Sequence, residues 1–556
     1  MIRNLIIIFA TLALTSCAIQ EGLRYPPSKW VKDEDRKPIA EPAKNMTAYD
    51  ISEADEEIYD QLENVMSFRY KLNVSNNFGA TGKQEALNTD NFDEVADSTW
   101  FTNQIGRFNQ FSFVNNKPCL DKNSNFSVIR IKQTPTGIPH IIVKDSAQNM
   151  YILKFDPPKL TGLLTSAEYV ADMILKEAGY NTPESFLMDI DLDDLMLAEN
   201  AKKRGKYGKM EKLSEQEFVS IKDKIGGKGK VRTLVTKIPD GTIIGPFVFS
   251  GRRYGDKNDR IPHEHRRELR GYKIFSSWLN LSSFGAADTL DVFVPLAENG
   301  NGYLTHYLFD LDSVFGNIGD LQNDKEANTG IDKKQVLTSL FSFGLYQNSN
   351  NDVKDKDDFS YLPYKDFDPG RWRSKIQNAA FIYMTEIDAF WAAKIIMCFS
   401  DKDIEEIVNK AEYSDKLFKD NLIKAIIKRR DKVGEYWFSK LTPLDNFYLD
   451  DKGDSLVINF DDLGVKYGFV EQGAMDYSYM LYTSYGRAEL IPWATTKDGS
   501  VVISPEVAKL IEKDRIYSLK IQAKEQNEEW WRTPVKLYLK RTNDGIILVG
   551  LTRKVK

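Results

Sequence analysis

The chain has 556 residues and a net charge of −6, and 42% of its residues are hydrophobic and 12% aromatic. The acidic balance argues against a nucleic-acid-binding protein, because such proteins need a broad basic face. The hydrophobic content is sufficient for a sizeable core, and the length predicts two or three domains.

The N-terminal residues predict secretion followed by a lipid anchor. Arg3 precedes the ten-residue apolar run Leu5–Leu14, which has the length of a signal peptide and is too short to span a bilayer. The adjoining Leu14-Thr15-Ser16-Cys17 resembles the bacterial lipobox. That resemblance implies a signal peptide over 1–16, with diacylglycerol and palmitate on Cys17, and Ala18 favours the outer membrane. An ordinary secretory signal with a chance cysteine is the alternative.

Two further cysteines, Cys119 and Cys398, follow the predicted cleavage site. An oxidising periplasm would allow them to pair, but their spacing does not decide whether they meet. Residues 17–60 are polar, with four prolines and an acidic cluster around Asp55, which predicts a lipidated tether. A short helix is expected over 54–66.

Alternating apolar residues begin near residue 126 and predict a small antiparallel sheet. Its strands are expected at 127–131, 139–144, 151–156 and 185–190. Between the last two, residues 166–179 fit a helix with Val170, Ile174 and Ala178 on one face and Gly179 as its stop. Several strands, one helix and a further strand form the order found in the small lobe of a protein kinase. We therefore assign 61–190 to such a lobe with an N-terminal extension.

The next region, 191–440, is predicted to form a mainly helical large lobe. It begins with a charged, glycine-containing stretch over 191–232, which we expect to be an inserted helical or mobile segment. Helices are then expected from Pro262 to Leu281, over 372–398 and over 401–440. A hairpin is predicted between the first two of these helices, with strands at 290–296 and 303–311.

The C-terminal residues, 441–556, change in character and contain short alternating strands between Asp-Gly turns. They predict an all-β, sandwich-like domain. Trp493, Trp530 and Trp531 could form an aromatic platform there for a protein or glycan partner, or could belong to the core. The predicted fold class is thus α+β, with a two-lobed kinase-like domain followed by a β-rich accessory domain.

Three side chains carry the predicted chemistry. Lys154 lies near the end of an early strand, Glu168 in the first turn of the next helix and Asp310 after the late hairpin. Phosphoryl-transfer proteins use a lysine to hold phosphates, a glutamate to hold that lysine and acidic side chains to hold Mg²⁺. Glu177 and Asp312 are the second choices for the glutamate and the metal ligand. Taken alone, Lys154 could also be a solvent-facing strand lysine.

A second concentration of charge lies over 252–271, which contains six arginines. Arg266 and Arg267 are candidates for contact with the phosphates of a cofactor. The alternative is a structural network of ion pairs around a helix. A metal site on His263 and His265 is weakly indicated, because residues two apart on a helix point about 200° apart.

Four motifs carry a resemblance to a known family: Tyr151–Asp156, Ala178–Glu184, Pro262–Gly271 and His306–Asp310. They look like a group of bacterial secreted lipoproteins similar in plan to the atypical HipA-like and CotH-like kinases. The likeness covers roughly residues 100–440. It implies a two-lobed protein-kinase-like fold, with ATP between the lobes and Mg²⁺ or Mn²⁺ on Asp288 and Asp310.

The chain departs from this family in the catalytic loop. Ser283 stands where the family has its base aspartate, and Asp288 stands where it has a metal-binding asparagine. Aspartate can still bind Mg²⁺, but a serine cannot accept a proton at neutral pH as a carboxylate does. Asp288 and Asp291 are the candidate catalytic residues that are left, and whether the protein is an enzyme stays open.

The sequence therefore predicts an outer-membrane lipoprotein of the cell envelope with a kinase-like domain that binds nucleotide or phosphate. Such a protein would be either a pseudokinase or a weak phosphotransferase. The alternative is a non-enzymatic binding or scaffold lipoprotein, in which the kinase-like part is only structural. A metal-dependent hydrolase has only scattered carboxylates in its favour.

Overall fold

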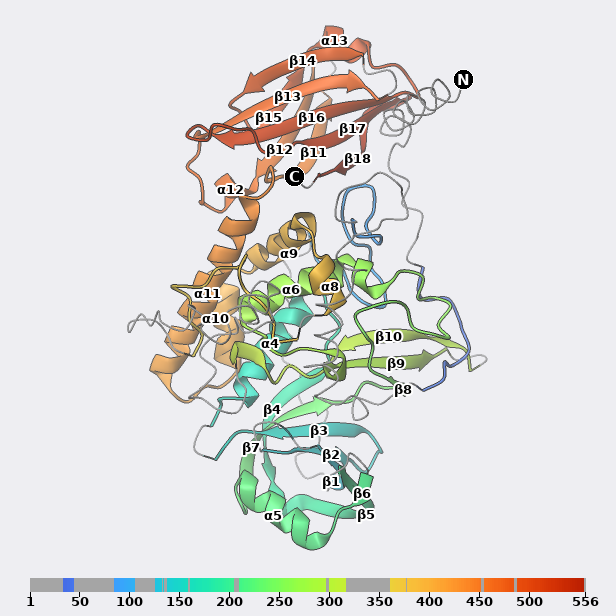
Figure 1. Cartoon of the computed structure of the whole chain (residues 1–556), viewed down its shortest axis with the longest axis vertical. Coiled ribbons are helices and arrows are strands. Elements are labelled where there is room, and N and C mark those ends of the chain that lie inside the picture. The colour runs from blue at the N-terminus through green and yellow to red at the C-terminus, as the bar shows by residue number, and fades with distance from the viewer. Residues whose placement is uncertain are drawn as a thin grey trace, which may run out of the picture.

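The computed structural model describes residues 34–44, 85–105, 126–132, 134, 138–158, 161–204, 210–296, 300–316, 361–376, 378–451, 455–484 and 488–554. Cys17, Cys119 and the helix predicted over 54–66 lie outside these ranges. Within them, no helix combines the length and the apolar character needed to cross a membrane. The described strands form four sheets. Along the long axis, a sheet at one end is followed by a helical middle region and then by the C-terminal strands (Figure 1).

The sheet at the lower end of Figure 1 has seven strands in the order β4-β7-β3-β2-β1-β5-β6. Neighbouring strands are antiparallel except for the parallel pair β1 and β5. The elements of this region are β1 Phe126–Lys132, β2 His140–Lys144, β3 Met150–Phe155, α4 Thr165–Ala178, β4 Glu184–Asp191, β5 Leu195–Arg204, β6 Met210–Lys212, α5 Glu215–Ile225 and β7 Lys230–Lys237. The strands and the helix predicted before residue 191 are all present.

Helix α4 forms where the apolar periodicity predicts it. Val170, Ile174 and Ala178 are buried, and Gly179 ends the helix with a φ of 111°, a left-handed conformation that favours glycine. The N-cap residue of α4, Leu164, provides no side-chain hydrogen bond to the first turn. The carboxylate of Asp156 accepts the backbone N–H groups of residues 162, 164 and 165 instead, which joins the end of β3 to the first turn of α4.

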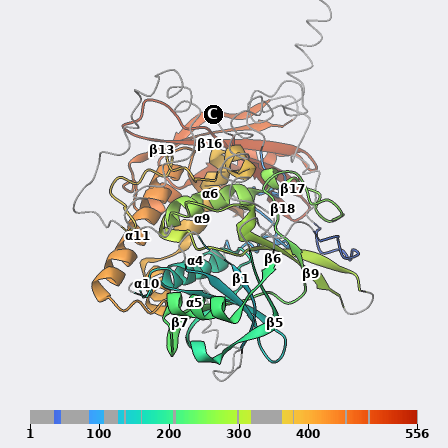
Figure 2. The same ribbon diagram turned by 60° about the horizontal axis from the view of Figure 1, so that its bottom comes forward.

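The segment expected to be an inserted helical or mobile stretch is mostly part of the sheet. It contributes β5, β6 and β7, and its only helix within the described residues of 210–232 is α5. Ser214 caps α5 in a capping box with Glu217, and Phe218 and Ile221 of that helix pack into the core of the seven-stranded sheet. Figure 2, which brings this end forward, shows α5 lying across the sheet.

The middle region contains a three-stranded sheet, in the order β10-β9-β8, and several helices. Its elements are β8 Thr242–Gly245, α6 Arg267–Leu279, β9 Thr289–Pro295, β10 Gly302–Leu308, α8 Ala379–Tyr383, α9 Glu386–Cys398, α10 Asp401–Lys410 and α11 Lys416–Phe438. The helix predicted from Pro262 begins at Arg267, because His263–His265 form a short 3₁₀ turn. The helix predicted over 372–398 is divided, and Thr385 caps its second part.

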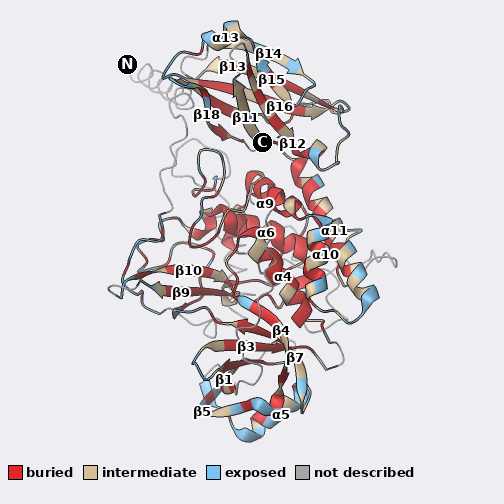
Figure 3. Ribbon diagram, turned by 180° about the vertical axis from the view of Figure 1, so that it is seen from behind, coloured by how far each residue is buried: buried red, intermediate tan, exposed pale blue. Residues whose placement is uncertain are grey.

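Helices α6 and α9 are buried on almost every side and form the centre of the largest core (Figure 3). Gly271 of α6 allows their close approach, since a Cβ atom there would lie 2.9 Å from the ring of Trp391 on α9. Helix α9 is mainly apolar, whereas α6 also buries the charged side chains of Arg267, Glu268 and Arg270.

The C-terminal strands form two antiparallel sheets, in the orders β11-β12-β15 and β14-β13-β16-β17-β18. Their elements are β11 Leu444–Asp451, β12 Leu456–Asp462, α12 Leu463–Lys466, β13 Met475–Thr483, β14 Glu489–Thr496, β15 Ser500–Ile503, α13 Pro505–Lys509, β16 Ile516–Glu525, β17 Val535–Thr542 and β18 Gly545–Thr552. Ile458 of the first sheet and Leu519 of the second share one apolar core, as expected of a sandwich. Trp493 and Trp530 lie outside this core and are exposed.

Candidate functional site

Lys154, Glu168 and Asp310 meet at one point between the seven-stranded sheet and the helical region. The ammonium group of Lys154 on β3 forms an ion pair with Glu168 of α4 and lies 2.6 Å from Oδ1 of Asp310, which follows β10. All three side chains are at least nine-tenths buried. The structure therefore brings together the lysine, the glutamate and the aspartate that the sequence singled out.

Local contacts explain why these three groups converge. The cap that Asp156 provides fixes the first turn of α4, and Glu168 points from that turn towards Lys154. Glu168 also accepts the backbone N–H of Leu311 at 3.3 Å, which ties α4 to the segment after β10. The backbone N–H of Asp310 donates to the carbonyl of Asp288 at 3.0 Å. Glu168 and Asp310 are thus each held by a hydrogen bond that involves the backbone, in addition to their ion pairs with Lys154.

Two further residues of this site, Lys132 and His140, were missed by the sequence analysis. The ammonium group of Lys132, the last residue of β1, lies 2.5 Å from Oδ2 of Asp310. His140 lies opposite Lys132 in the register of β1 and β2, and its buried Nδ1 atom has no hydrogen-bond partner. The only sequence signal was that the two residues flank the connection between β1 and β2, at the closed end of that hairpin.

The charges of this site are strongly coupled. Burial raises the pKa of Asp310, but the ammonium groups of Lys132 and Lys154 outweigh this effect and hold the pKa well below its usual range. Burial and the neighbouring Asp310 raise the pKa of Asp312 to about 7. Burial, together with the charge of Lys154, lowers the pKa of His140 well below its usual value. Near neutral pH the site therefore contains an ionised Asp310, two ammonium groups and a neutral imidazole.

Ser283 and Asp288, from the loop before β9, lie beside this group. Ser283 is joined to the segment after Asp310, since its carbonyl accepts the hydroxyl of Ser313 at 2.6 Å. The carboxylate of Asp288 accepts the backbone N–H of Gly285 at 2.9 Å and so closes its own turn. The backbone of Ser283 is thus tied to Ser313, three residues after Asp310.

Asp291 does not join the lysine group. It is fully buried on β9, where Arg253 donates to it from Nε at 2.5 Å and His306 lies 2.6 Å away on the neighbouring strand. Both of its oxygens thus have a partner, and these contacts tie β9 to β10 and to Arg253. A catalytic role for Asp291 stays a prediction.

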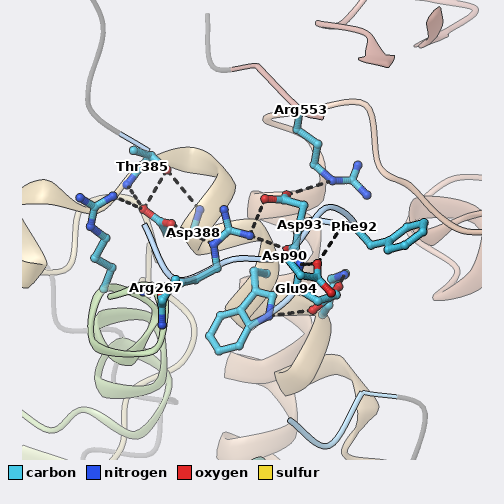
Figure 4. A network of polar contacts seen from close by, with 12 residues as sticks. Asp90, Phe92, Asp93, Glu94, Arg267, Thr385, Asp388 and Arg553 are labelled. Carbon is cyan, nitrogen blue, oxygen red and sulfur yellow. Dashed lines mark hydrogen bonds and ion pairs between the residues drawn. The ribbon is translucent and has the colours of Figure 1, made fainter. Parts of the chain in front are cut away.

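The structure also places Arg266 and Arg267 away from any surface on which a cofactor could bind. Arg266 is fully buried, with its guanidinium group over the ring of Trp100 at 4.6 Å and a contact to Glu268 at 3.3 Å. Arg267 contacts Asp93 at 2.7 Å and Asp388 at 3.2 Å (Figure 4). Of the two alternatives left open by the sequence, this arrangement matches the network of ion pairs.

Figure 4 shows that this network reaches the C-terminal sheets. Arg553, just after β18, donates to Asp445 of β11 at 2.8 Å and lies 3.8 Å from Asp93. Lys394 of α9 contacts the same Asp445 at 2.8 Å and also pairs with Glu94. The described segment 85–105 is therefore held between the helical region and the sandwich by buried charges.

A divalent metal ion at Asp310 would have to share that carboxylate with two lysines. Each carboxylate oxygen of Asp310 already contacts an ammonium group, one from Lys132 and one from Lys154. Across the described ranges, no group of three or more His, Cys, Asp or Glu side chains is arranged to hold a metal. His263 and His265 do not share a site either, since His263 contacts Asp259 and His265 contacts Arg270.

Two cavities bear on ligand binding. The one beside Lys154 has a volume of about 10 Å³ and is lined by His140, Glu168 and Asp312, which is space for about one water molecule. A larger cavity of about 530 Å³ lies at the turn between α4 and β4, with Lys176 and Tyr307 in its lining. Ligand pockets typically measure about 300–1,000 Å³, so a nucleotide beside Lys154 requires the surrounding side chains to move outward.

Comparisons with known proteins add little to this geometry. No protein-family model matches the chain, and no curated protein matches it. The solved structures that match include a proinflammatory kinase from Helicobacter pylori, CtkA, with 13% sequence identity, a TM-score of 0.28, and coverage of 56% of this chain and 98% of that chain. A likeness at that TM-score carries no conclusion about activity or substrate.

Proposed function

We propose that the protein is a lipid-anchored protein of the bacterial envelope whose kinase-like region binds the phosphate groups of a nucleotide such as ATP. One observation carries the proposal: the buried ammonium group of Lys154 lies between Glu168 and Asp310. A buried lysine held by a helix glutamate is the arrangement with which kinases position a triphosphate. The anchoring through Cys17 and the outer-membrane location rest on the N-terminal motif.

Binding is better supported than phosphoryl transfer. General base catalysis needs a group that accepts the proton of the attacking hydroxyl, and Ser283 cannot do so near neutral pH. Both oxygens of Asp291 already have a partner, Arg253 or His306, which argues against Asp291 as its replacement. The protein is therefore best described as a pseudokinase or a weak phosphotransferase, in which Lys154 binds phosphate and Glu168 holds that lysine in place.

Thermal denaturation of the full-length protein with ATP tests this function, because a ligand that binds only the folded state raises the melting temperature. We expect a rise at millimolar ATP that is lost in Lys154→Met and Asp310→Ala. Lys144→Ala is the matched control, since Lys144 stands on the same hairpin at the end away from Asp310. Absence of any rise with the wild-type protein, confirmed by calorimetry, would contradict nucleotide binding.

A non-enzymatic scaffold is the second candidate, and the exposed tryptophans of the sandwich favour it. Trp530 is 74% exposed and Trp493 is 47% exposed. Exposed aromatic side chains are common in surfaces that bind protein or glycan partners. Under this candidate, Trp530→Ala would abolish binding to envelope material, whereas Lys154→Met would leave it unchanged.

A further inference from the structure

We infer that Lys132 takes the place that a divalent metal ion occupies in phosphoryl-transfer sites, so that the protein binds nucleotide without Mg²⁺ or Mn²⁺. This inference rests on the proposed nucleotide-binding function. It departs from the kinase pattern at a single point, the cation that faces Asp310. Its support comes from the contacts of Asp310, the position of Lys132 and the chemistry of His140.

Asp310 is contacted by two lysines. Its two carboxylate oxygens are divided between two ammonium groups, with Lys132 at 2.5 Å on Oδ2 and Lys154 at 2.6 Å on Oδ1. In metal-dependent sites a carboxylate at this position neutralises a divalent ion that bridges the phosphates. Here both oxygens already face a cation, so a metal ion would have to share a buried, charge-assisted carboxylate with two lysines.

The position of Lys132 suits it to contact a phosphate. Its side chain is 29% exposed, whereas those of Lys154 and Asp310 are each 5% exposed. Lys132 therefore stands at the rim of the site, with Lys154 beneath it. An ammonium group has three donors, so Lys132 can keep its contact with Asp310 and still donate to a phosphate oxygen.

The charge of Lys132 is permanent. Burial lowers its pKa, but Asp310, Asp312 and Asp288 outweigh that effect and raise the pKa above the usual value. Lys132 and Lys154 thus provide two fixed positive charges within contact distance of one carboxylate. Both charges are shared with Asp310 and Glu168, and a phosphate would be bound by the N–H donors that these contacts leave over.

His140 adds a neutral hydrogen-bonding group beside Lys132. It is paired with Lys132 in the hairpin register and lines the small cavity beside Lys154. Its Nδ1 atom is buried and has no hydrogen-bond partner. Buried polar atoms are nearly always satisfied, so this nitrogen needs a partner, which a ligand that enters the cavity would supply in place of water.

Calorimetric titration of the full-length protein with ATP, in EDTA and in excess Mg²⁺, tests the inference. We expect the two dissociation constants to agree within about threefold. Binding that requires Mg²⁺ would overturn the inference and leave the proposed function standing. No binding under either condition would overturn the proposed function itself.

The variant Lys132→Ala distinguishes the contribution of Lys132 to ATP affinity from that of Lys154. In EDTA its affinity for ATP should fall at least tenfold, about 1.4 kcal/mol, while the control Lys144→Ala should stay close to the wild type. Circular dichroism confirms that each variant is folded, and Lys132→Gln serves if the alanine variant is not. Unchanged metal-free affinity in a folded variant that lacks the Lys132 charge would refute its role.

Discussion

The carboxylate of Asp156 accepts hydrogen bonds from Thr165, at 3.0 Å from its backbone N–H and at 2.7 Å from its hydroxyl group. This contact joins the strand that carries Lys154 to the helix that carries Glu168. The distance between the lysine and the glutamate is therefore set by a cap at the helix N-terminus rather than by the ion pair alone.

Replacing Asp156 by alanine should weaken both stability and ligand binding. Loss of an N-terminal cap costs about 0.5–2 kcal/mol, and the loosened first turn of α4 should release Glu168 from Lys154. Urea unfolding and ATP titration measure the two effects. Ser400→Ala, which removes the cap of α10, is the control: it should lower stability by a similar amount and leave ATP affinity intact. Equal ATP affinity in the two variants would argue against a positioning role for Asp156.

Because the pKa of Asp172 is raised, we expect an unusual pH dependence of stability. Burial raises its pKa to about 6, above the value of about 4 in an unfolded chain. The folded protein therefore binds a proton more tightly than the unfolded chain, so this group favours folding below pH 4 and loses that contribution as the pH rises through 6. Asp172→Asn should stabilise the protein by about 1–3 kcal/mol at pH 7.5 and have little effect at pH 4. Urea unfolding at the two pH values measures the difference, and an equal effect at both would contradict this assignment.

Arg267→Met should be strongly destabilising. The substitution leaves the buried carboxylate of Asp388 without one of its partners, and breaking a buried pair costs about 3–5 kcal/mol. The free energy of unfolding should show this loss. Lys466→Ala breaks the exposed pair with Asp461 and should cost less than about 1 kcal/mol. Similar losses in the two variants would show that the buried network contributes no more than a surface pair.

Cys17→Ala should release the protein from the membrane fraction, because the lipid chains are attached to that thiol under our proposal. Labelling with a palmitate analogue and fractionation of the host cells measure the effect. Cys398→Ala is the matched control, since burial raises the pKa of the Cys398 thiol to about 11 and makes it unreactive. Incorporation of label into the Cys17 variant would disprove the lipobox assignment.

Ser283→Asp tests whether the loop before β9 corresponds to a kinase catalytic loop. A carboxylate there can accept the proton of an attacking hydroxyl group, so we expect phosphoryl transfer from ATP to rise at least tenfold. Radiolabelled ATP with a generic protein acceptor measures the gain. Ser282→Asp, one position earlier, should show none. A gain in neither variant, with ATP still bound, would mean that more than the base is missing.

The sequence identified three residues of the site but missed a neighbouring residue that contacts one of them. Lys154, Glu168 and Asp310 were found because each stands at the end of a strand or the start of a helix, where the apolar pattern breaks. Lys132 stands at a comparable strand end but belongs to an alternating strand in which a polar residue is ordinary. Its role depends on a contact across 178 positions of the chain, which no local pattern encodes.

The strands β5 and β6 were missed for a different reason. β6 lies at the edge of its sheet, and its three residues are all exposed and include charged side chains. Charged edge strands prevent association between sheets, but in sequence they look like a solvated segment. The Arg266 and Arg267 alternatives could not be resolved in advance either, because their carboxylate partners lie in distant segments that only folding brings near.

The paired contacts of Asp445 with Lys394 and Arg553 also restrict how the molecule can respond to its neighbours. Breaking a buried pair is costly, so a rotation of the β-sandwich against the helical region would have to separate Asp445 from Lys394. A partner that binds the sandwich would therefore meet resistance before it could change the angle between these two regions.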